Sequence, residues 1–179
     1  MIQNKEDLKR YLTVEGKKYK KKWYFHLPIL MTEQQVLFQH AYFLRKAEYA
    51  ANTGKITRIW YLFRLLRIQT RYGISIPLNV LEEGFEMAHL GSVIINAGSR
   101  IGKHAKLHPG VCVGANHGKA PKIGDNAYLG PGAKVFGDIT LGDNIQVGAN
   151  AVVTKSCLKD GAILVGVPAK DISEEKGFY

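Results

Sequence analysis

One histidine stands out among the residues whose type and spacing could support catalysis. His89 follows three glutamates, Glu82, Glu83 and Glu86. An imidazole, whose pKa is roughly 6.5, can remove a proton at neutral pH, and a nearby carboxylate such as Glu86 could orient it. His89 also lies six residues before Ile95, at a position where a six-residue aliphatic pattern predicts an aliphatic residue. These features make His89 a candidate general base.

The rest of the sequence argues against several other kinds of chemistry. It contains no Ser-His-Asp order, no paired catalytic carboxylates and no glycine fingerprint of a dinucleotide site. The two cysteines, Cys112 and Cys157, fit neither a disulfide framework nor a metal-binding spacing. We therefore expect no metal site and two reduced cysteines in the core.

Charge, aromatic residues and glycines divide the chain near residue 72. Residues 1–72 carry 15 Lys and Arg against 5 Asp and Glu, with 13 of the 18 aromatic residues. Residues 73–179 carry 10 basic and 10 acidic residues and 17 of the 19 glycines. No stretch reaches the roughly 18 apolar residues of a membrane-spanning helix, and the charged start is unlike a secretory signal. We expect two differently built regions in a cytoplasmic protein.

The second region contains a six-residue repeat of aliphatic residues, often followed by glycine. Small or β-branched residues often stand four places after each aliphatic residue, and both sets are predicted to point inward. The aliphatic positions are Ile95, Ile101, Leu107, Val113, Ile123, Leu129, Val135, Leu141, Val147 and Val153. This pattern predicts a parallel β-helix, in which each coil covers the next. A break between Val113 and Ile123 predicts a protruding loop over 115–122, where solenoids tend to carry binding residues.

Residues 1–72 are predicted to form helices joined by short loops. A helix over Thr32–Asn52 begins with a capping-box-like Thr-Glu-Gln-Gln. A second helix over Ile56–Tyr72 has a wide apolar face edged by arginines. The most basic segment is Lys17–Lys22, followed by the aromatic triplet 23–25.

Several stretches make the second region similar to a known family. These are AHLGSVIIN around His89, PKIGDNAYLGPGAKVFGDI at 121–139, VGANAVV at 147–153 and VGVPAK at 165–170. The chain resembles the serine acetyltransferase branch of the left-handed β-helix (hexapeptide) acyltransferases. The resemblance implies a mainly β fold with an N-terminal α-helical region 1–72, a β-helix domain 73–171 and a C-terminal tail 172–179.

The resemblance implies transfer of an acetyl group from acetyl-CoA to a hydroxyl, with His89 as the catalytic base. It places CoA along the β-helix edge, where backbone amides contact it and lysines meet its phosphates. The implied CoA contacts are Ala115, Gly130, Pro131, Gly148, Ala149, Lys134, Lys155 and Lys170. Gly130 and Gly148 would keep the approach open, whereas Pro131 has no N–H to donate. His117 and Lys119, in the inserted loop, are candidate acceptor contacts.

Three positions depart from the enzymes that acetylate serine. Those enzymes have aspartates where this chain has Ile74 and Ala88, and an Arg-His pair where it has Lys119-Ala120. The missing groups would orient the base or hold the charged ends of serine. We therefore expect an acceptor that lacks the amino and carboxyl groups of an amino acid, namely a sugar of a surface polysaccharide or its precursor. The Ile-Pro-x-Asn-Val and Met-Ala-His patterns, here at 76–80 and 87–89, also resemble polysaccharide O-acetyltransferases.

Alternatives to this function stay open. The chain could be a serine O-acetyltransferase of cysteine biosynthesis, or a hexapeptide scaffold without catalytic activity. The resemblance also implies a homotrimer with sites between subunits. No recognised motif accompanies the basic N-terminal region, so we expect no nucleic-acid partner. The helix over Ile56–Tyr72 could instead contact a membrane surface peripherally, or pack its apolar face within the trimer.

Overall fold

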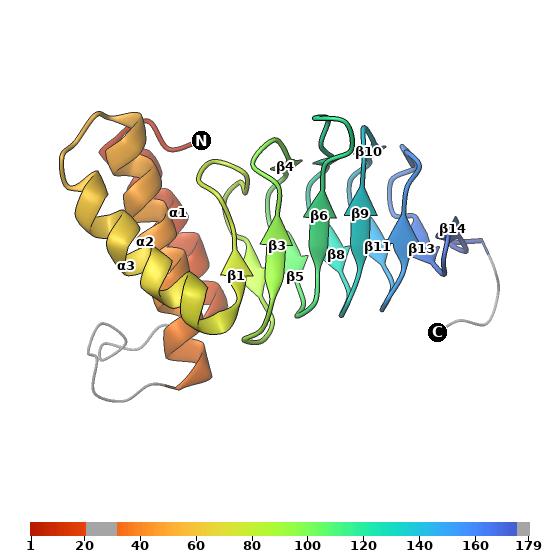
Figure 1. Ribbon diagram of the computed structural model, residues 1–179, viewed down its shortest axis with the longest axis horizontal. Helices are drawn as coiled ribbons and strands as arrows, with labels where there is room; N and C mark the ends of the chain where they lie inside the picture. Colours follow the sequence, from red (N-terminus) through yellow and green to blue (C-terminus); the bar gives the residue numbers. More distant parts are fainter. Residues whose placement is uncertain (21–31, 175–179) are drawn as a thin grey trace.

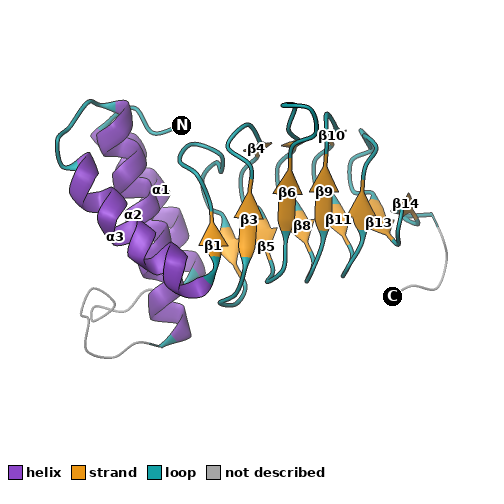
Figure 2. Ribbon diagram, in the orientation of Figure 1, coloured by secondary structure: helices purple, strands orange, loops and turns teal. Residues whose placement is uncertain are grey.

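The computed structural model describes residues 1–20 and 32–174. Within these residues the helices stand side by side at one end of an elongated coil of short strands (Figure 1). The helices occupy the first part of the chain, and every strand lies after residue 73 (Figure 2). The predicted fold class, a β-helix with an N-terminal helical region, is confirmed. No helix among the described residues is long and apolar enough to cross a membrane.

The helices begin and end at recognisable capping residues. They are α1 Lys5–Lys18, α2 Glu33–Asn52 and α3 Arg58–Tyr72. Asn4 accepts a hydrogen bond from the Asp7 amide, and Thr32 accepts one from the Gln35 amide, as N-caps do. Gly73 ends α3 in the left-handed conformation.

The predicted helix Thr32–Asn52 is confirmed, with Thr32 as its cap. The predicted Ile56–Tyr72 helix begins two residues later, because Ile56 and Thr57 form a turn. The aromatic triplet and the last two lysines of the basic segment lie outside the described residues.

A buried arginine attaches α1 and α2 to the β-helix. The Arg45 guanidinium on α2 donates to Glu15 Oε1 on α1 at 2.7 and 2.9 Å and to Glu48 Oε2 at 2.8 Å. It also donates to the carbonyls of Leu81 and Glu82 in the first coil, at 2.9 and 2.7 Å. One side chain thus holds three segments together. Burial raises the pKa of Glu15 to about 7, although the Arg45 charge opposes this.

Within residues 73–174, fourteen short strands form three faces of the β-helix. They are β1 Ile74–Ser75, β2 Glu86–Met87, β3 Val93–Ile95, β4 Arg100–Ile101, β5 Lys106–Leu107, β6 Cys112–Gly114, β7 Lys122–Ile123, β8 Tyr128–Leu129, β9 Lys134–Phe136, β10 Thr140–Leu141, β11 Gln146–Val147, β12 Val152–Val153, β13 Ile163–Val165 and β14 Lys170–Asp171. The sheets run β1-β3-β6-β9-β12, β10-β7-β4 and β14-β13-β11-β8-β5-β2. All pairings are parallel except β13 with β14.

The interior of the β-helix is built from the residues that the repeat predicts. All ten aliphatic repeat residues are buried, and so are the eight small or β-branched residues that follow them: Ser99, Ala105, Val111, Ala127, Ala133, Ile139, Ile145 and Ala151. Stacking of such residues from coil to coil removes apolar surface from water, which a single coil could not do. The cysteines differ from the expectation. Both are free thiols, but they are only half-buried.

The predicted loop is a tight hairpin. Asn116 and Lys119 exchange two backbone hydrogen bonds of 2.9 and 3.0 Å across His117 and Gly118, both of which have positive φ. Positive φ at both central positions is typical of a type I′ turn. The four residues from Asn116 to Lys119 are exposed, so the insertion protrudes as expected.

Candidate functional site

His89 lies in an irregular corner of the first coils. Met87 pairs with Leu107 and Ile94 pairs with Cys112. Six residues therefore lie between Met87 and Ile94, whereas four lie between their partners in the next coil. The two extra residues enlarge the turn at 89–91, which lies opposite Pro109 alone. The turn therefore projects from the β-helix and carries the imidazole with it.

The position of His89 differs from the simple six-residue phase. Met87, which is buried, occupies the inward position of this coil. His89 is displaced outward by the enlarged turn, and its side chain is 66% exposed. The expectation that His89 occupies an aliphatic slot is therefore wrong. Its exposure nevertheless suits a general base, which must reach a substrate from solvent.

A carboxylate from the helical region contacts the His89 turn. Glu33 is the first residue of α2, and its Oε2 atom lies 3.5 Å from His89 Nδ1. Its Oε1 atom accepts a 2.8 Å hydrogen bond from the Leu90 amide. One carboxylate thus holds both the backbone of the turn and the ring. Glu33 could not be predicted from its distance to His89 in sequence, because it lies 56 positions before His89. Its only signal in the sequence is its place beside a helix cap.

The three glutamates close to His89 in sequence have other partners. Glu86 Oε1 lies 3.6 Å from Lys106 Nζ, and Glu86 Oε2 lies 4.0 Å from Lys18 Nζ. Glu83 accepts a 2.7 Å hydrogen bond from Arg10 Nε. Glu82 bonds the Tyr11 hydroxyl and the N-terminal amine. In this chain Glu33 therefore takes the place beside His89 that was predicted for Glu86.

A second histidine lies beside the site. The Ala88 amide donates to the Leu107 carbonyl in the following coil. His108, the residue after Leu107, therefore lies next to Ala88. The His108 ring packs against Tyr128 with centroids 5.0 Å apart, and its Nε2 atom is buried without a partner among the described residues. Burial, together with the charge of Lys106, lowers the pKa of His108. Its ring therefore stays neutral at neutral pH. His108 was not among the predicted site residues, although it stands where a glycine usually follows the aliphatic residue of the repeat.

Four predicted CoA contacts share a corner with His89. The turns between the six-stranded and five-stranded sheets stack at 88–92, 108–111, 130–133 and 148–151, which we call the site edge. Gly130, Pro131, Gly148 and Ala149 lie on it. A Cβ on Gly130 would lie 2.8 Å from the Val147 carbonyl oxygen, so packing between coils itself requires glycine there. The Pro131 carbonyl accepts from the Asn150 amide, which leaves the proline ring exposed.

The remaining predicted CoA contacts are more scattered. Lys134 is half-buried and donates to the carbonyls of Gly110 and Gly132 on the site edge. Ala115 and Lys155 follow strands of the five-stranded sheet, at its opposite end, and Lys170 is exposed on β14. The amides of Ala115 and Ala149 form no hydrogen bond within the described chain. Free amides of this kind fit a ligand such as CoA, which the resemblance predicts to be bound by backbone N–H groups.

The inserted loop does not reach His89 within one chain. His89 precedes β3, whereas His117 and Lys119 follow β6, so the two groups lie at opposite ends of the five-stranded sheet. Lys119 pairs with Asp138 at 2.8 Å, and both side chains are exposed. This pair raises the pKa of Lys119, which therefore stays charged.

The two positions at which the serine enzymes have aspartates carry no charge here. Ile74 is buried in β1, and Ala88 is half-buried beside His108. No cluster of three His, Cys, Asp or Glu side chains that could hold a metal ion exists among residues 1–20 and 32–174.

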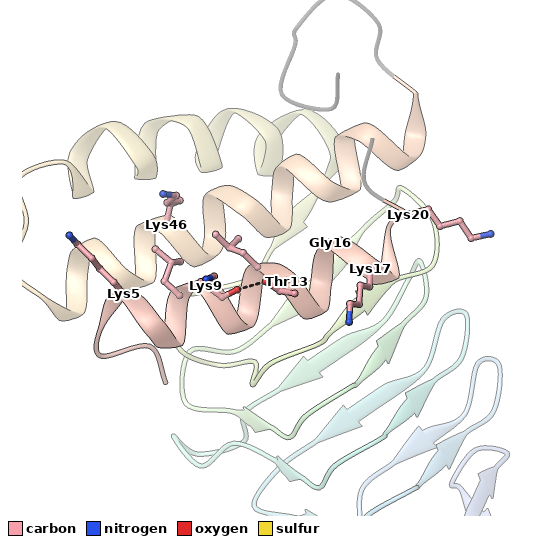
Figure 3. Close-up of a pocket in the computed structure, with 9 residues that line it drawn as sticks. Lys5, Lys9, Thr13, Gly16, Lys17, Lys20 and Lys46 are labelled. Carbon is pink, nitrogen blue, oxygen red and sulfur yellow. Dashed lines mark hydrogen bonds between the residues drawn. The ribbon is translucent and has the colours of Figure 1, made fainter. Parts of the chain in front are cut away.

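A basic groove lies away from the site, between α1 and α2. Its volume is about 640 Å³, and its lining includes Lys5, Lys9, Lys17, Lys20 and Lys46. Figure 3 shows Lys46 on α2, with the other labelled lysines on α1 or, for Lys20, just beyond its end. None of its lining residues belongs to the site edge.

Comparisons with known proteins agree with this geometry. The family described as "Bacterial transferase hexapeptide (six repeats)" matches residues 120–155. The chain is 35% identical over 126 residues to the serine acetyltransferase of Helicobacter pylori strain J99, covering 66% of this chain and 73% of that protein. It is 34% identical over 123 residues to the serine acetyltransferase of Staphylococcus xylosus, covering 65% of this chain and 56% of that protein.

Solved structures show the same fold. The soybean serine acetyltransferase apoenzyme superposes with a TM-score of 0.74 at 21% identity, over 93% of this chain and 69% of that chain. The Neisseria gonorrhoeae serine acetyltransferase in complex with serine gives a TM-score of 0.68 at 22% identity, over 92% and 69%. The fold is thus a left-handed parallel β-helix with an N-terminal helical region. Given the match to the Helicobacter pylori protein, the chain belongs to the serine acetyltransferase-like family of hexapeptide-repeat transferases and is an acyltransferase.

Proposed function

We propose that this chain transfers the acetyl group of acetyl-CoA to a hydroxyl group, with His89 as general base. The observation that carries the proposal is the projecting turn at 89–91, which presents His89 beside Glu33 on the site edge. The relatives are named serine acetyltransferases, which supports an O-acetyl transfer of this kind.

The proposed reaction needs only these groups and the two substrates. The neutral His89 ring takes the proton of the acceptor hydroxyl as its oxygen attacks the thioester carbonyl carbon. The C–S bond then breaks, and the imidazolium returns the proton to the CoA thiolate. The products are the acetyl ester and free CoA, and His89 is neutral again. Glu33 favours the imidazolium while the proton is held, because its carboxylate lies 3.5 Å from Nδ1.

Serine is the acceptor that the relatives support. Their names favour it over the saccharide acceptor expected from the sequence. For serine, Glu33 is the carboxylate closest to His89 that could also hold the substrate ammonium group. A saccharide hydroxyl remains the second candidate, since Ile74 is buried, Ala88 carries no charge and Lys119 is paired with Asp138.

A trimer would complete the site. His117 and Lys119 lie at the opposite end of the five-stranded sheet from His89 in one chain, so a neighbouring copy would have to supply them. Ile94 and Phe136 are exposed on that sheet, which supports a neighbour covering it. We propose a closed trimer with three sites between subunits.

The test is CoA thiol release from acetyl-CoA by the wild type and by His89→Ala. We expect the variant to lose about 10²–10⁴-fold in kcat, the range usual for removal of a general base. The matched control is His104→Asn, which changes an exposed histidine away from the site edge and keeps a residue tolerant of its positive φ. Full activity of His89→Ala would overturn the proposal.

The same assay separates the acceptors. L-serine, monosaccharides, nucleotide sugars and oligosaccharides are supplied in separate reactions. Turnover with serine supports the acceptor of the relatives, and turnover with a sugar alone supports the second candidate. If acetyl-CoA does not bind, the chain is a scaffold rather than an acetyltransferase.

A further inference from the structure

Helix α3 exposes an apolar stripe that nothing in the described chain covers. Ile59, Leu62, Phe63 and Leu66 recur at intervals of three and four residues, so they lie on one face of the helix. They are between 37% and 65% exposed. Another side of α3 packs against α2, and Leu65 is the residue of α3 that is buried. Single exposed apolar residues are ordinary, but a continuous stripe marks an interaction surface.

The same helix carries only positive charges. Arg58, Arg64, Arg67 and Arg71 all lie on α3, which has no acidic residue. None of the four forms an ion pair with the residues that the structure describes. Arg67 lies over the Phe63 ring at 5.7 Å. The guanidinium groups therefore border the apolar stripe and keep their charge for another partner.

Three of these arginines line a groove beside the stripe. The groove lies between α2 and α3 and has a volume of about 560 Å³. Its lining includes Arg64, Arg67 and Arg71 together with Trp60 and Phe63. A guanidinium group can donate two parallel hydrogen bonds to the oxygens of one phosphate. Aromatic rings suit the boundary between water and acyl chains.

We propose that α3 docks on the surface of an anionic phospholipid bilayer. Ile59, Phe63 and Leu66 enter the boundary between headgroups and acyl chains, while the groove arginines hold lipid phosphates. An interfacial helix needs this combination of an apolar face and bordering cations. The +10 excess of residues 1–72 attracts the whole helical region to a negative surface. The proposal adds to the acetyltransferase function and does not depend on it.

Charge argues against a second copy of α3 as the occupant. In a two-fold contact the same surface meets itself, so the arginines of each copy would face those of the other. With no acidic residue on α3 to separate them, like charges would oppose the contact. A lipid surface provides an apolar layer that the stripe can enter and negative charges that the arginines can bind.

The test is co-sedimentation of the full-length protein with phospholipid vesicles. One set contains phosphatidylcholine alone, and the other contains phosphatidylcholine mixed with phosphatidylglycerol. We expect binding only to the mixed vesicles, weakening as salt rises. The double variants Phe63→Ala/Leu66→Ala and Arg67→Gln/Arg71→Gln should each weaken binding at least about tenfold. These side chains are exposed, so the variants should fold, and circular dichroism checks this.

Two matched controls lie on the β-helix. Leu158→Ala removes an exposed leucine, and Lys122→Gln removes an exposed cation; both should bind vesicles like the wild type. The proposal is overturned if the wild type binds neither vesicle, or if the α3 variants bind as well as the controls. It is also overturned if the apolar double variant reduces the particle mass in light scattering, because α3 would then join copies of the chain.

Discussion

The helical region and the β-helix stabilise their interiors in different ways. The β-helix stacks aliphatic and small side chains, and Ser99 is the one buried polar residue between 73 and 174. All other buried polar or charged side chains of the described residues lie in the helices, with Arg45 at their centre. A repeated apolar interior needs only the correct residue type in each coil, whereas the helical interior needs particular partners.

This difference predicts that the substitution with the largest effect on stability, Arg45→Ala, destabilises only part of the molecule. The change removes the cation shared by Glu15 and Glu48 and leaves two first-coil carbonyls without their donor. We expect a loss of about 3–5 kcal/mol, as for a buried ion pair deprived of one partner. Urea unfolding measures the loss, and hydrogen exchange locates it. Protection should fall in α1 and α2, while the coils around Leu129 keep theirs.

Arg100→Ala is the matched control on the β-helix. Its guanidinium is exposed and, among the described residues, donates only to the carbonyls of Ala97 and Ser99, so we expect a loss below about 0.5 kcal/mol. If Arg45→Ala lowered protection equally in every coil, the two regions would form one cooperative unit, and the comparison would fail.

The second prediction concerns pH, because buried titratable groups belong to the helices. The pKa of Glu15 is raised to about 7 from an ordinary 4.5, so the folded chain binds a proton that the unfolded chain lacks between these values. Its contribution to the free energy of unfolding therefore decreases as pH rises through this interval. Burial lowers the pKa of His40 to about 3, so its contribution increases as pH rises from 3 to 6.5. The two contributions oppose each other in the wild type.

Glu15→Gln separates these contributions. Relative to the wild type, the variant should gain stability as pH rises from 5 to 7, by on the order of 2 kcal/mol. Urea unfolding at a series of pH values measures the difference. Asp143→Asn, which changes an exposed carboxylate of the β-helix, serves as the control. Parallel curves for Glu15→Gln and the wild type would show that Glu15 is already ionised in the folded chain.

The sequence predicted the β-helix in more detail than the helices, for the same physical reason. The same positions point inward in every coil, so the pattern recurs along the sequence. Ten aliphatic positions could therefore be assigned from their spacing alone. The Arg45 contacts join segments 30 and 36 residues apart through one unrepeated cluster. No local pattern marks a buried arginine of this kind, and α2 reads simply as an amphipathic helix with charged residues.

The candidate site was predictable only where it follows the repeat. The corner turns at Gly130 and Gly148 follow directly from the spacing. The enlarged turn at 89–91 does not, since two added residues shift His89 out of phase while Met87 takes the inward position. The place of Glu33 depends on how α2 docks on the first coil, which no periodicity records. Local reasoning therefore favoured Glu86, the carboxylate closest in sequence.

Glu33 joins the two regions, and the smallest predicted effect concerns it. Glu33→Gln removes the negative charge beside His89 but keeps an oxygen that can accept from the Leu90 amide. We expect about a tenfold loss in kcat, near 1.4 kcal/mol, with KM for acetyl-CoA unchanged. If serine is the acceptor and Glu33 holds its ammonium group, KM for serine should rise as well. Glu6→Gln is the matched control, because Glu6 also lies in the first turn of a helix and loses the same interaction with the helix dipole. Equal kinetics of Glu33→Gln and Glu6→Gln would mean that the helical region supports the fold of the site but not its chemistry.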